Sequence, residues 1–375
     1  MTSLEAAVSA AAALERASKQ QDFFSDASGL PRIGLFGNGI PETMVAAAGA
    51  LPVHVSLGTT QTTHPITTVI EPFVDEEVRH FLIRLMNGDF AHLAGIVFAR
   101  DDAPALIACQ YASEWIRQDR ERGATPPLFL WNLVHTDTRP AAEFNRIQAE
   151  KLFAFLERVG LARPDDSRLA LAAGAEAARA DALGQLQSAV GVTRSGRTAA
   201  AWRNAGRFMG AAEHASLLRN ALASPPEVLN STTRIGIVGS PLASPATYAM
   251  IEQFGTVVCD QQNFGQMWPA PGNARASLDD ILTATAADAS CFRIAPTSAY
   301  RAALVRNLLR TRCTLVICQL AHTDDTFGWE IPALFAELAA HNIACMNLGF
   351  RDAEPDAAWL ERASLTISHS LEVGT

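Results

Sequence analysis

The sequence predicts an α/β protein with two parallel sheets that repeat one another, a helical middle segment and an N-terminal helix. The first observation is that short apolar runs bounded by Gly, Pro or Asp alternate with helical patterns, as in βαβ units. The second is that one pattern of residues occurs in both halves of the chain. The third is a long central stretch without strand-like runs. A chain of 375 residues has room for two or three such units.

Residues 1–29 are predicted to form an amphipathic helix, with Ala and Leu at helical spacing. Glu5, Glu15 and Arg16 interrupt the apolar pattern, and no basic stretch precedes it, so a signal peptide is not expected. Residues 30–139 are predicted to form the first α/β domain. Its strand-like runs are 33–36, 51–55, 95–98 and 128–131.

Residues 140–230 are predicted to be a helical segment that ends in a Pro-, Ser- and Asn-rich linker. Residues 231–375 are predicted to form the second α/β domain, because strand-like runs resume there. These runs are 235–238, 256–259, 314–318 and 343–346.

The two predicted domains begin with the same pattern. RIGLFG starts at Arg32 and RIGIVG starts at Arg234, an offset of 234 − 32 = 202 residues. The repeat predicts two Rossmann-like sheets of one topology. A small polar residue, a proline that opens a helix and a glycine that ends it follow in each copy: Asn38, Pro41 and Gly49, then Ser240, Pro245 and Gly255.

Composition excludes several classes of protein. A net charge of -9 lacks the basic footprint of a nucleic-acid binder. No run of about 20 apolar residues is present, so no membrane span is expected and the cytoplasm is the expected compartment. No two cysteines form a CxxC pair, and six in so long a chain do not make a disulfide scaffold.

Acidic pairs follow two of the predicted strands, one in each domain. Asp101 and Asp102 come after the run at 95–98, and Asp324 and Asp325 come after the run at 314–318. Ligands of open α/β sheets bind beyond the carboxyl ends of strands, which favours a functional role. Asp is also a preferred helix N-cap, and that alternative stays open for both pairs. His322, in the same predicted loop, is a candidate acid or base.

Glycine turns follow the first strand of each domain. Asn38 and Gly39 in the first, and Gly239 and Ser240 in the second, are expected to form tight turns. The free amides of such turns can bind an anion or a carbonyl group. They are therefore candidate cofactor-binding residues.

Several segments resemble the subunits of 2-hydroxyacyl-CoA dehydratases and benzoyl-CoA reductases. The segments are GIPETMVAAAGALPVHV, RIGIVGSPLASPATYAMIEQFGTVVCD and FGWEIPALFAELAAHNIACMNL. The resemblance implies a two-domain α/β subunit that binds a CoA thioester in its cleft and pairs with a homologous partner subunit. It also implies an iron–sulfur cluster on cysteines, which an ATP-driven activator reduces, and it places Asp260 and Asn263 among the candidate cofactor-binding residues.

The cysteine positions that the resemblance implies hold aspartate in this chain. They fall at Asp75, at Asp101 or Asp102, and at Asp324 or Asp325. Iron–sulfur clusters select thiolates, so the ligands of the implied cluster are absent.

Three interpretations follow from the aspartates. The chain is a cluster-free subunit that binds acyl-CoA or braces a cysteine-bearing partner. Alternatively, it is an acyl-CoA hydratase or dehydratase in which carboxylates, His322 or Tyr248 act as acid or base. In the third interpretation, the aspartates converge on a divalent cation.

Overall fold

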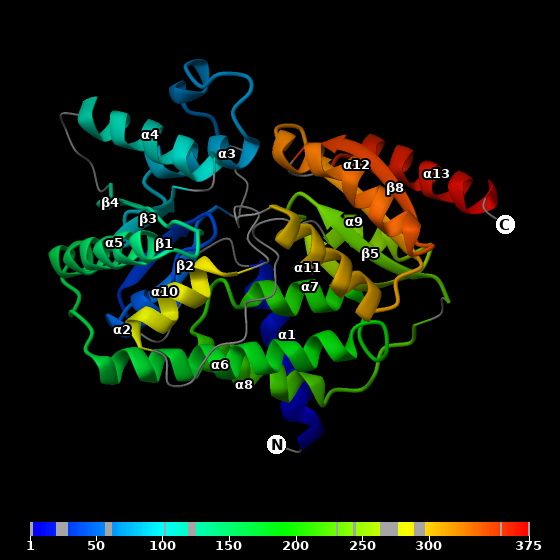
Figure 1. Cartoon of the computed structure of the whole chain (residues 1–375), viewed down its shortest axis with the longest axis horizontal. Coiled ribbons are helices and arrows are strands. Elements are labelled where there is room, and N and C mark those ends of the chain that lie inside the picture. Colours follow the sequence, from blue (N-terminus) through cyan, green and yellow to red (C-terminus); the bar gives the residue numbers. More distant parts are fainter. Residues whose placement is uncertain are drawn as a thin grey trace.

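A computed structural model describes most of the chain. The described residues are 3–19, 29–56, 62–100, 103–118, 125–229, 232–242, 245–262, 277–288, 297–352 and 355–373. Eight strands in this part form two four-stranded parallel sheets with helices around them (Figure 1). The predicted pair of Rossmann-like parallel sheets is confirmed.

The first sheet has the strand order β2-β1-β3-β4. Every residue of β3 is buried, because helices cover both faces of the sheet and a parallel strand between them has no solvent-facing side. The strands are β1 (Arg32–Phe36), β2 (Leu51–His54), β3 (Gly95–Ala99) and β4 (Leu128–Trp131). The helices around it are α2 (Glu42–Ala47), the short η1 (Pro65–Thr68), α3 (Glu76–Met86), α4 (Ala103–Gln118) and α5 (Arg139–Arg158).

The second sheet has the strand order β6-β5-β7-β8, the same topology as the first. The strands are β5 (Arg234–Gly239), β6 (Thr256–Gln262), β7 (Leu315–Ala321) and β8 (Ala344–Arg351). The helices that follow them are α9 (Pro245–Ile251), α10 (Leu278–Ala286), α11 (Thr297–Arg310), α12 (Asp325–Ala340) and α13 (Ala357–Val373). All eight predicted strand runs correspond to these strands, and the shared order confirms the repeat.

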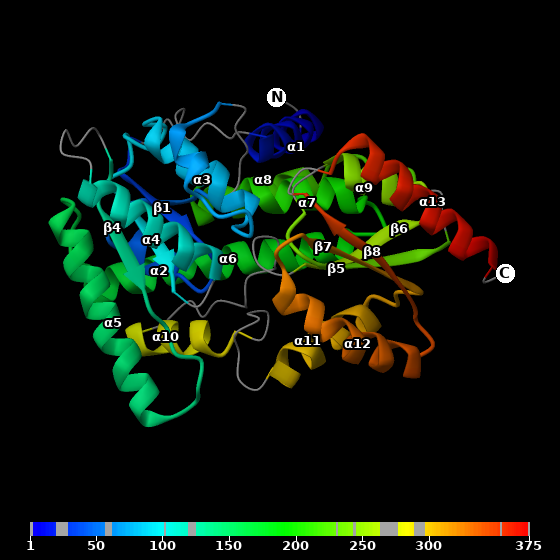
Figure 2. The same cartoon turned by 90° about the horizontal axis from the view of Figure 1, so that it is seen from above.

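The middle of the chain is helical, as predicted, and lies beside both sheets (Figures 1 and 2). It contains α6 (Asp166–Ala189), α7 (Gly196–Ala205) and α8 (Ala211–Leu222). The N-terminal helix α1 (Ser3–Lys19) packs against α7 and α8 and shares an apolar core with them. Helix α6 contacts α2 of the first sheet, and α7 contacts strand β6 of the second. The helical middle is therefore the support that both sheets share.

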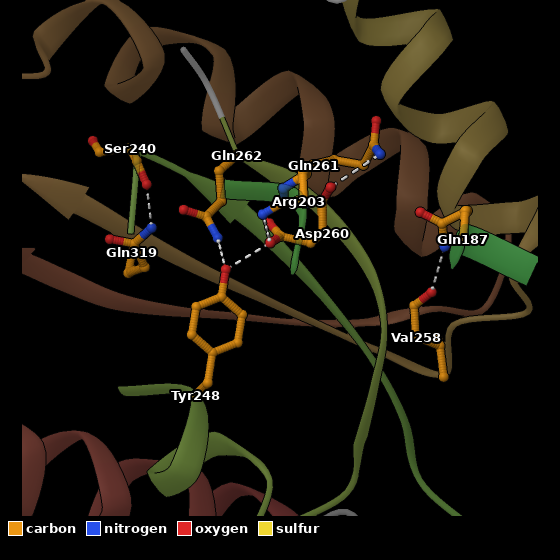
Figure 3. Close-up of polar contacts among 9 residues, drawn as sticks. All are labelled: Gln187, Arg203, Ser240, Tyr248, Val258, Asp260, Gln261, Gln262 and Gln319. Carbon is orange, nitrogen blue, oxygen red and sulfur yellow. Dashed lines mark hydrogen bonds and ion pairs between the residues drawn. The ribbon is translucent and has the colours of Figure 1, made fainter. Parts of the chain in front are cut away.

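The edge strand β6 is covered by the helical middle. The side-chain amide of Gln187 on α6 donates to the carbonyl oxygen of Val258, at 3.1 Å (Figure 3). Gly191 and Gly196 lie so close to Val258 and Val257 that an added Cβ would overlap those side chains. This cover satisfies a backbone group that an edge strand would otherwise leave open.

Helix α10 crosses from the second sheet toward the first. It contacts α5 and α6, and its Ile281 and Leu282 belong to the core of the first sheet. Arg146 of α5 forms an ion pair with Asp279. A helix from the predicted second domain, 231–375, thus packs on the first core, while the domain boundaries themselves stay predictions.

The prolines and glycines predicted to begin and end the first helix of each repeat differ in part from their prediction. Gly49 has φ +90, as expected for a glycine after a helix. Gly255 does not have positive φ. An added Cβ there would lie 2.7 Å from the carbonyl oxygen of Thr233, so this glycine serves close packing and not a left-handed helix stop. Pro41 is the N-cap of α2, one residue before the helix that it was predicted to open.

Within the described part of the chain, no helix is long and apolar enough to cross a membrane.

We predict that Gly239→Ala destabilises the protein by more than about 2 kcal/mol. Gly239 has φ +111, and an added Cβ would overlap the carbonyl oxygen of Gln319, which is backbone and cannot move aside. Urea unfolding measures the change. Gly174→Ala on α6 is the control, because nothing lies near its added Cβ, and it should stabilise by about 0.5–1 kcal/mol. An unchanged unfolding midpoint for Gly239→Ala would contradict the prediction.

Candidate functional site

The strand order of each sheet places the predicted site residues around two switch points. In the first sheet β2 lies on one side of β1 and β3 lies on the other, so the connections before and after β2 run in opposite directions. The second sheet has the same arrangement, with β6 and β7 on the two sides of β5. Ligands of such sheets bind where the loops beyond these carboxyl ends diverge. The backbone of Asp101, Asp102 and Asn263 and the side chain of Asp325 lie outside the described residues.

Ser240 and Asp324 meet at the second switch point. The Ser240 hydroxyl donates to Asp324 Oδ2 at 2.6 Å and accepts from the Ala321 amide at 2.8 Å. Asp324 Oδ1 accepts from the Phe327 amide at 3.0 Å. Asp324 is therefore the N-cap of α12, the alternative that the sequence left open. A catalytic role for it stays a prediction.

The turn at Gly239 and Ser240 is held from the neighbouring strands. The Ser240 amide donates to the Gln319 carbonyl at 3.0 Å, and the Gln319 side chain donates to the Ser240 carbonyl at 2.5 Å (Figure 3). Arg351, which is 2% exposed, donates to the Gln319 side chain and to the Pro241 carbonyl. The Ser240 amide is thus already used, which leaves the turn less able to bind an anion than predicted.

The equivalent turn in the first sheet keeps an unused donor. Gly37 and Gly39 have φ +91 and +76, which only glycine adopts readily. The indole of Trp131 donates to the Gly39 carbonyl at 2.9 Å and fixes the turn. The buried amide nitrogen of Asn38 has no hydrogen-bond partner among the described residues. A ligand oxygen could therefore accept from Asn38.

Asp260, near the carboxyl end of β6, is the centre of a buried polar cluster (Figure 3). Its Oδ2 accepts from Arg203 and from the Tyr248 hydroxyl, both at 2.6 Å. Gln262 donates to the Tyr248 oxygen at 2.7 Å. Asp260 Oδ1 is buried without a hydrogen-bond partner among the described residues.

In this cluster Tyr248 has a structural role, whereas the Asp260 carboxylate can still bind a further group. Burial raises the pKa of Tyr248 well above its usual value, and the adjacent Asp260 charge raises it further. Tyr248 is 2% exposed. It therefore stays protonated and hidden, which makes it unsuited as the general base considered from the sequence. The second oxygen of Asp260 remains able to accept one more hydrogen bond.

Two other predicted residues lie at the surface or near it. His322 has a side chain that is 64% exposed, lies 3.4 Å from Asp352 and stacks on Phe350. Asp75 is half-buried at the N-cap of α3. The described side chains do not form a group of three or more His, Cys, Asp or Glu that could hold a metal ion.

A second buried ion cluster lies between α2 and α6, and it was not predicted from the sequence. Arg179 donates to Glu42 at 2.8 Å and pairs with Glu176 at 2.6 Å. His54 lies 2.9 Å from the other oxygen of Glu42. Burial alone would raise the pKa of Glu42, but Arg179 and His54 hold it well below its usual value. Glu42 is the glutamate of the PETM segment, so that motif was the available signal.

The donor set does not fit an iron–sulfur cluster. The positions that the resemblance gives to cluster thiols carry carboxylates, and the Asp324 carboxylate is committed to its cap and to Ser240. The described cysteines lie elsewhere, on or beside α4, β6, β7 and β8. Burial raises the pKa of Cys318 and brings that of Cys345 to about 11, which opposes the thiolate form that a cluster needs. We therefore derive no chemistry through a cluster on this chain.

We predict that Arg203→Leu destabilises the protein by about 3–5 kcal/mol, because it leaves the Asp260 carboxylate buried without its cation. Urea unfolding measures the loss. Arg203→Leu combined with Asp260→Asn should recover part of it, since the double variant carries no buried charge at this place. A double variant less stable than the single one would contradict the ion-pair explanation.

We predict that Glu176 makes stability fall as pH rises toward neutrality. Burial raises the pKa of Glu176 from 4.5 to about 7, against the opposing charge of Arg179. The folded protein then binds a proton that the unfolded chain has lost, so this contribution is complete below pH 4.5 and disappears as pH rises through about 7. As pH rises through this range, the unfolding free energy of the wild type should fall relative to that of Glu176→Gln, so that the two curves converge or cross. The exposed control Glu143→Gln should follow the wild type. Parallel curves for Glu176→Gln would refute the assignment.

The comparisons with known proteins agree with this architecture. No curated protein matches the chain. The family described as 2-hydroxyglutaryl-CoA dehydratase, D-component, matches residues 38–363. The match runs from the turn after β1 to within α13, and so spans both sheets and the helical middle. The chain belongs to the 2-hydroxyglutaryl-CoA dehydratase D-component family.

Proposed function

We propose that this protein is an acyl-CoA-binding subunit of a dehydratase-type complex that does not carry an iron–sulfur cluster of its own. The family match supports the acyl-CoA ligand and the partner subunit. The observation that carries the cluster-free part is the donor set: carboxylates stand at the positions that the resemblance gives to cluster thiols, and the described cysteines occupy other positions, on or beside α4, β6, β7 and β8. A homologous partner would then supply any thiolate-bound cluster that the complex uses.

The ligand is proposed to lie beyond the carboxyl ends of the two sheets. Asn38 offers an unused amide donor there, and Asp260 offers an unused acceptor. Gly39 allows close approach of a ligand to the backbone, because it lacks a Cβ. Ser240 is proposed not to contact the ligand. Its hydroxyl lies 2.6 Å from Asp324 Oδ2 and so holds Asp324 and the loop after β7 in place. Asn263 follows β6 and is proposed as a further contact.

Cluster-free acid–base chemistry is the competing function. The carboxylates at Asp75, Asp101, Asp102, Asp324 and Asp325, with His322, would then hydrate or dehydrate an acyl-CoA. The hydrogen bonds of Asp324 count against this function. Its carboxylate caps α12 and accepts from Ser240, and a carboxylate held in this way is a poor proton carrier. A divalent cation on the same aspartates would be a third case.

We predict that the purified chain binds CoA thioesters but contains no iron and turns none over by itself. Calorimetry with acetyl-CoA measures binding, and metal analysis after anaerobic reconstitution with iron and sulfide measures cluster assembly. Saturable heat, a colourless protein and no loss or gain of water in an acyl-CoA assay are expected. Stoichiometric iron and sulfide with broad visible absorbance would overturn the cluster-free proposal.

One variant, Asp75→Asn, and the dependence of turnover on a partner chain separate the two functions. If the chain is itself a hydratase, turnover without a partner should occur and should fall with Asp75→Asn. If it is a binding subunit, turnover should require a co-purifying homologous chain. No heat with acetyl-CoA at saturating concentration would count against both functions.

A further inference from the structure

Arg207 follows α7 and faces the first sheet. Its amide donates to the Asn204 carbonyl at 3.0 Å, which continues the turn of the helix. Its own carbonyl accepts from the amide of His54, the last residue of β2, also at 3.0 Å. Arg203, four residues earlier, pairs with Asp260 at the end of β6. The two arginines therefore connect α7 to the carboxyl ends of the two equivalent edge strands.

The guanidinium of Arg207 differs from those of Arg179 and Arg203, which are paired with carboxylates, because it lacks such an ion pair among the described residues. No hydrogen bond or ion pair joins it to any residue in the described part of the chain, although the side chain is half-buried. Burial and the nearby charge of Arg203 lower the pKa of Arg207 to about 9, although the charge of Glu42 opposes this fall. A buried charge without a counter-ion costs free energy, so a binding partner for it is favoured.

The carboxylates nearby are already committed. Glu42 and Glu176 both pair with Arg179, at 2.8 Å and 2.6 Å, and Asp260 pairs with Arg203. None of them forms an ion pair with Arg207 among the described contacts. The charge of Glu42 acts favourably on Arg207 without an ion pair between them, so the guanidinium has no directly paired counter-ion in the described part of the chain, and a diffusible anion would pair with it.

A second unused donor lies at the same edge of the sheet. Asn38 follows β1, which pairs with β2 so that Leu35 lies opposite His54. Its buried amide nitrogen has no partner among the described residues. Two donors without acceptors, one of them charged, match an oxyanion such as a phosphate or a carboxylate.

We propose that Arg207 binds an oxyanion of the ligand at the carboxyl edge of the first sheet, with Asn38 as a second donor. The inference rests on the proposed function for the identity of the ligand. Two parts of an acyl-CoA carry this chemistry, the phosphates of CoA and a carboxylate on the acyl chain. Arginine suits either group, since its planar fork can donate two parallel hydrogen bonds.

The test compares wild type, Arg207→Met and Arg207→Lys in melting temperature at constant ionic strength, with sodium chloride, inorganic phosphate or succinate. Phosphate or succinate should raise the wild-type melting temperature above that in chloride. Arg207→Met should melt no lower than wild type in chloride, because it removes an unpaired charge, and should lose the rise. Arg207→Lys should keep part of it. Arg197→Met, at an exposed site on α7, should respond like the wild type.

Binding of CoA and of succinate by calorimetry separates the two sources. Loss of CoA affinity by roughly ten- to hundredfold in Arg207→Met assigns the site to a CoA phosphate. Loss of succinate binding with unchanged CoA affinity assigns it to an acyl carboxylate. Equal binding of every probe by Arg207→Met and wild type overturns the inference and leaves the proposed function standing. Wild type that binds phosphate through Arg207 but not CoA overturns the proposed function instead.

Discussion

A buried charge needs a partner, and this requirement fixes how the helical middle joins the two sheets. Arg203 on α7 reaches Asp260 of β6, and Arg179 on α6 reaches Glu42 of α2, at 2.6 and 2.8 Å. Both guanidinium groups are nearly hidden from solvent, so breaking either pair would leave a carboxylate stranded in a poorly solvated place. The two pairs therefore define the positions of the sheets relative to their common support.

The need of buried polar groups for partners also separates the residues that hold the loops of the site in place from those that can bind a ligand. Ser240 and Asp324 are hydrogen-bonded to each other and to the start of α12, and the amide nitrogen of Gln262 donates to the Tyr248 oxygen beside Asp260. These groups keep the loops in place. Among the described residues, the groups near these carboxyl ends without a hydrogen-bond partner include one oxygen of Asp260, the side-chain oxygen of Gln262 and the amide nitrogen of Asn38, and the guanidinium of Arg207 has no ion pair. Unused donors and acceptors in such a place are where a ligand gains most from binding.

Membership of the family does not by itself bring the family's chemistry. A fold supports different reactions when the side chains at its site change. In this chain carboxylates stand where the resemblance implies cluster thiols, and Cys259 and Cys318 are buried inside strands of the second sheet. Hard oxygen ligands and soft iron–sulfur clusters match poorly, so these carboxylates do not fit the cluster that the resemblance implies.

The sequence by itself determined the eight strands, their parallel arrangement, the repeat and the helical middle. Short continuous apolar runs ended by Gly, Pro or Asp and separated by helical patterns are typical of strands buried between helices. It also located the loops at 37–41 and 239–242. Tertiary structure decided that Asp324 is a cap and that Gly255 serves packing. The chain has 28 arginines, which are the 30 basic residues less Lys19 and Lys151. No local sequence pattern sets Arg179, Arg203 and Arg207 apart from the others, and only the tertiary structure gave them different roles. Pairing of charges depends on distances between segments far apart in the chain, which no local pattern encodes.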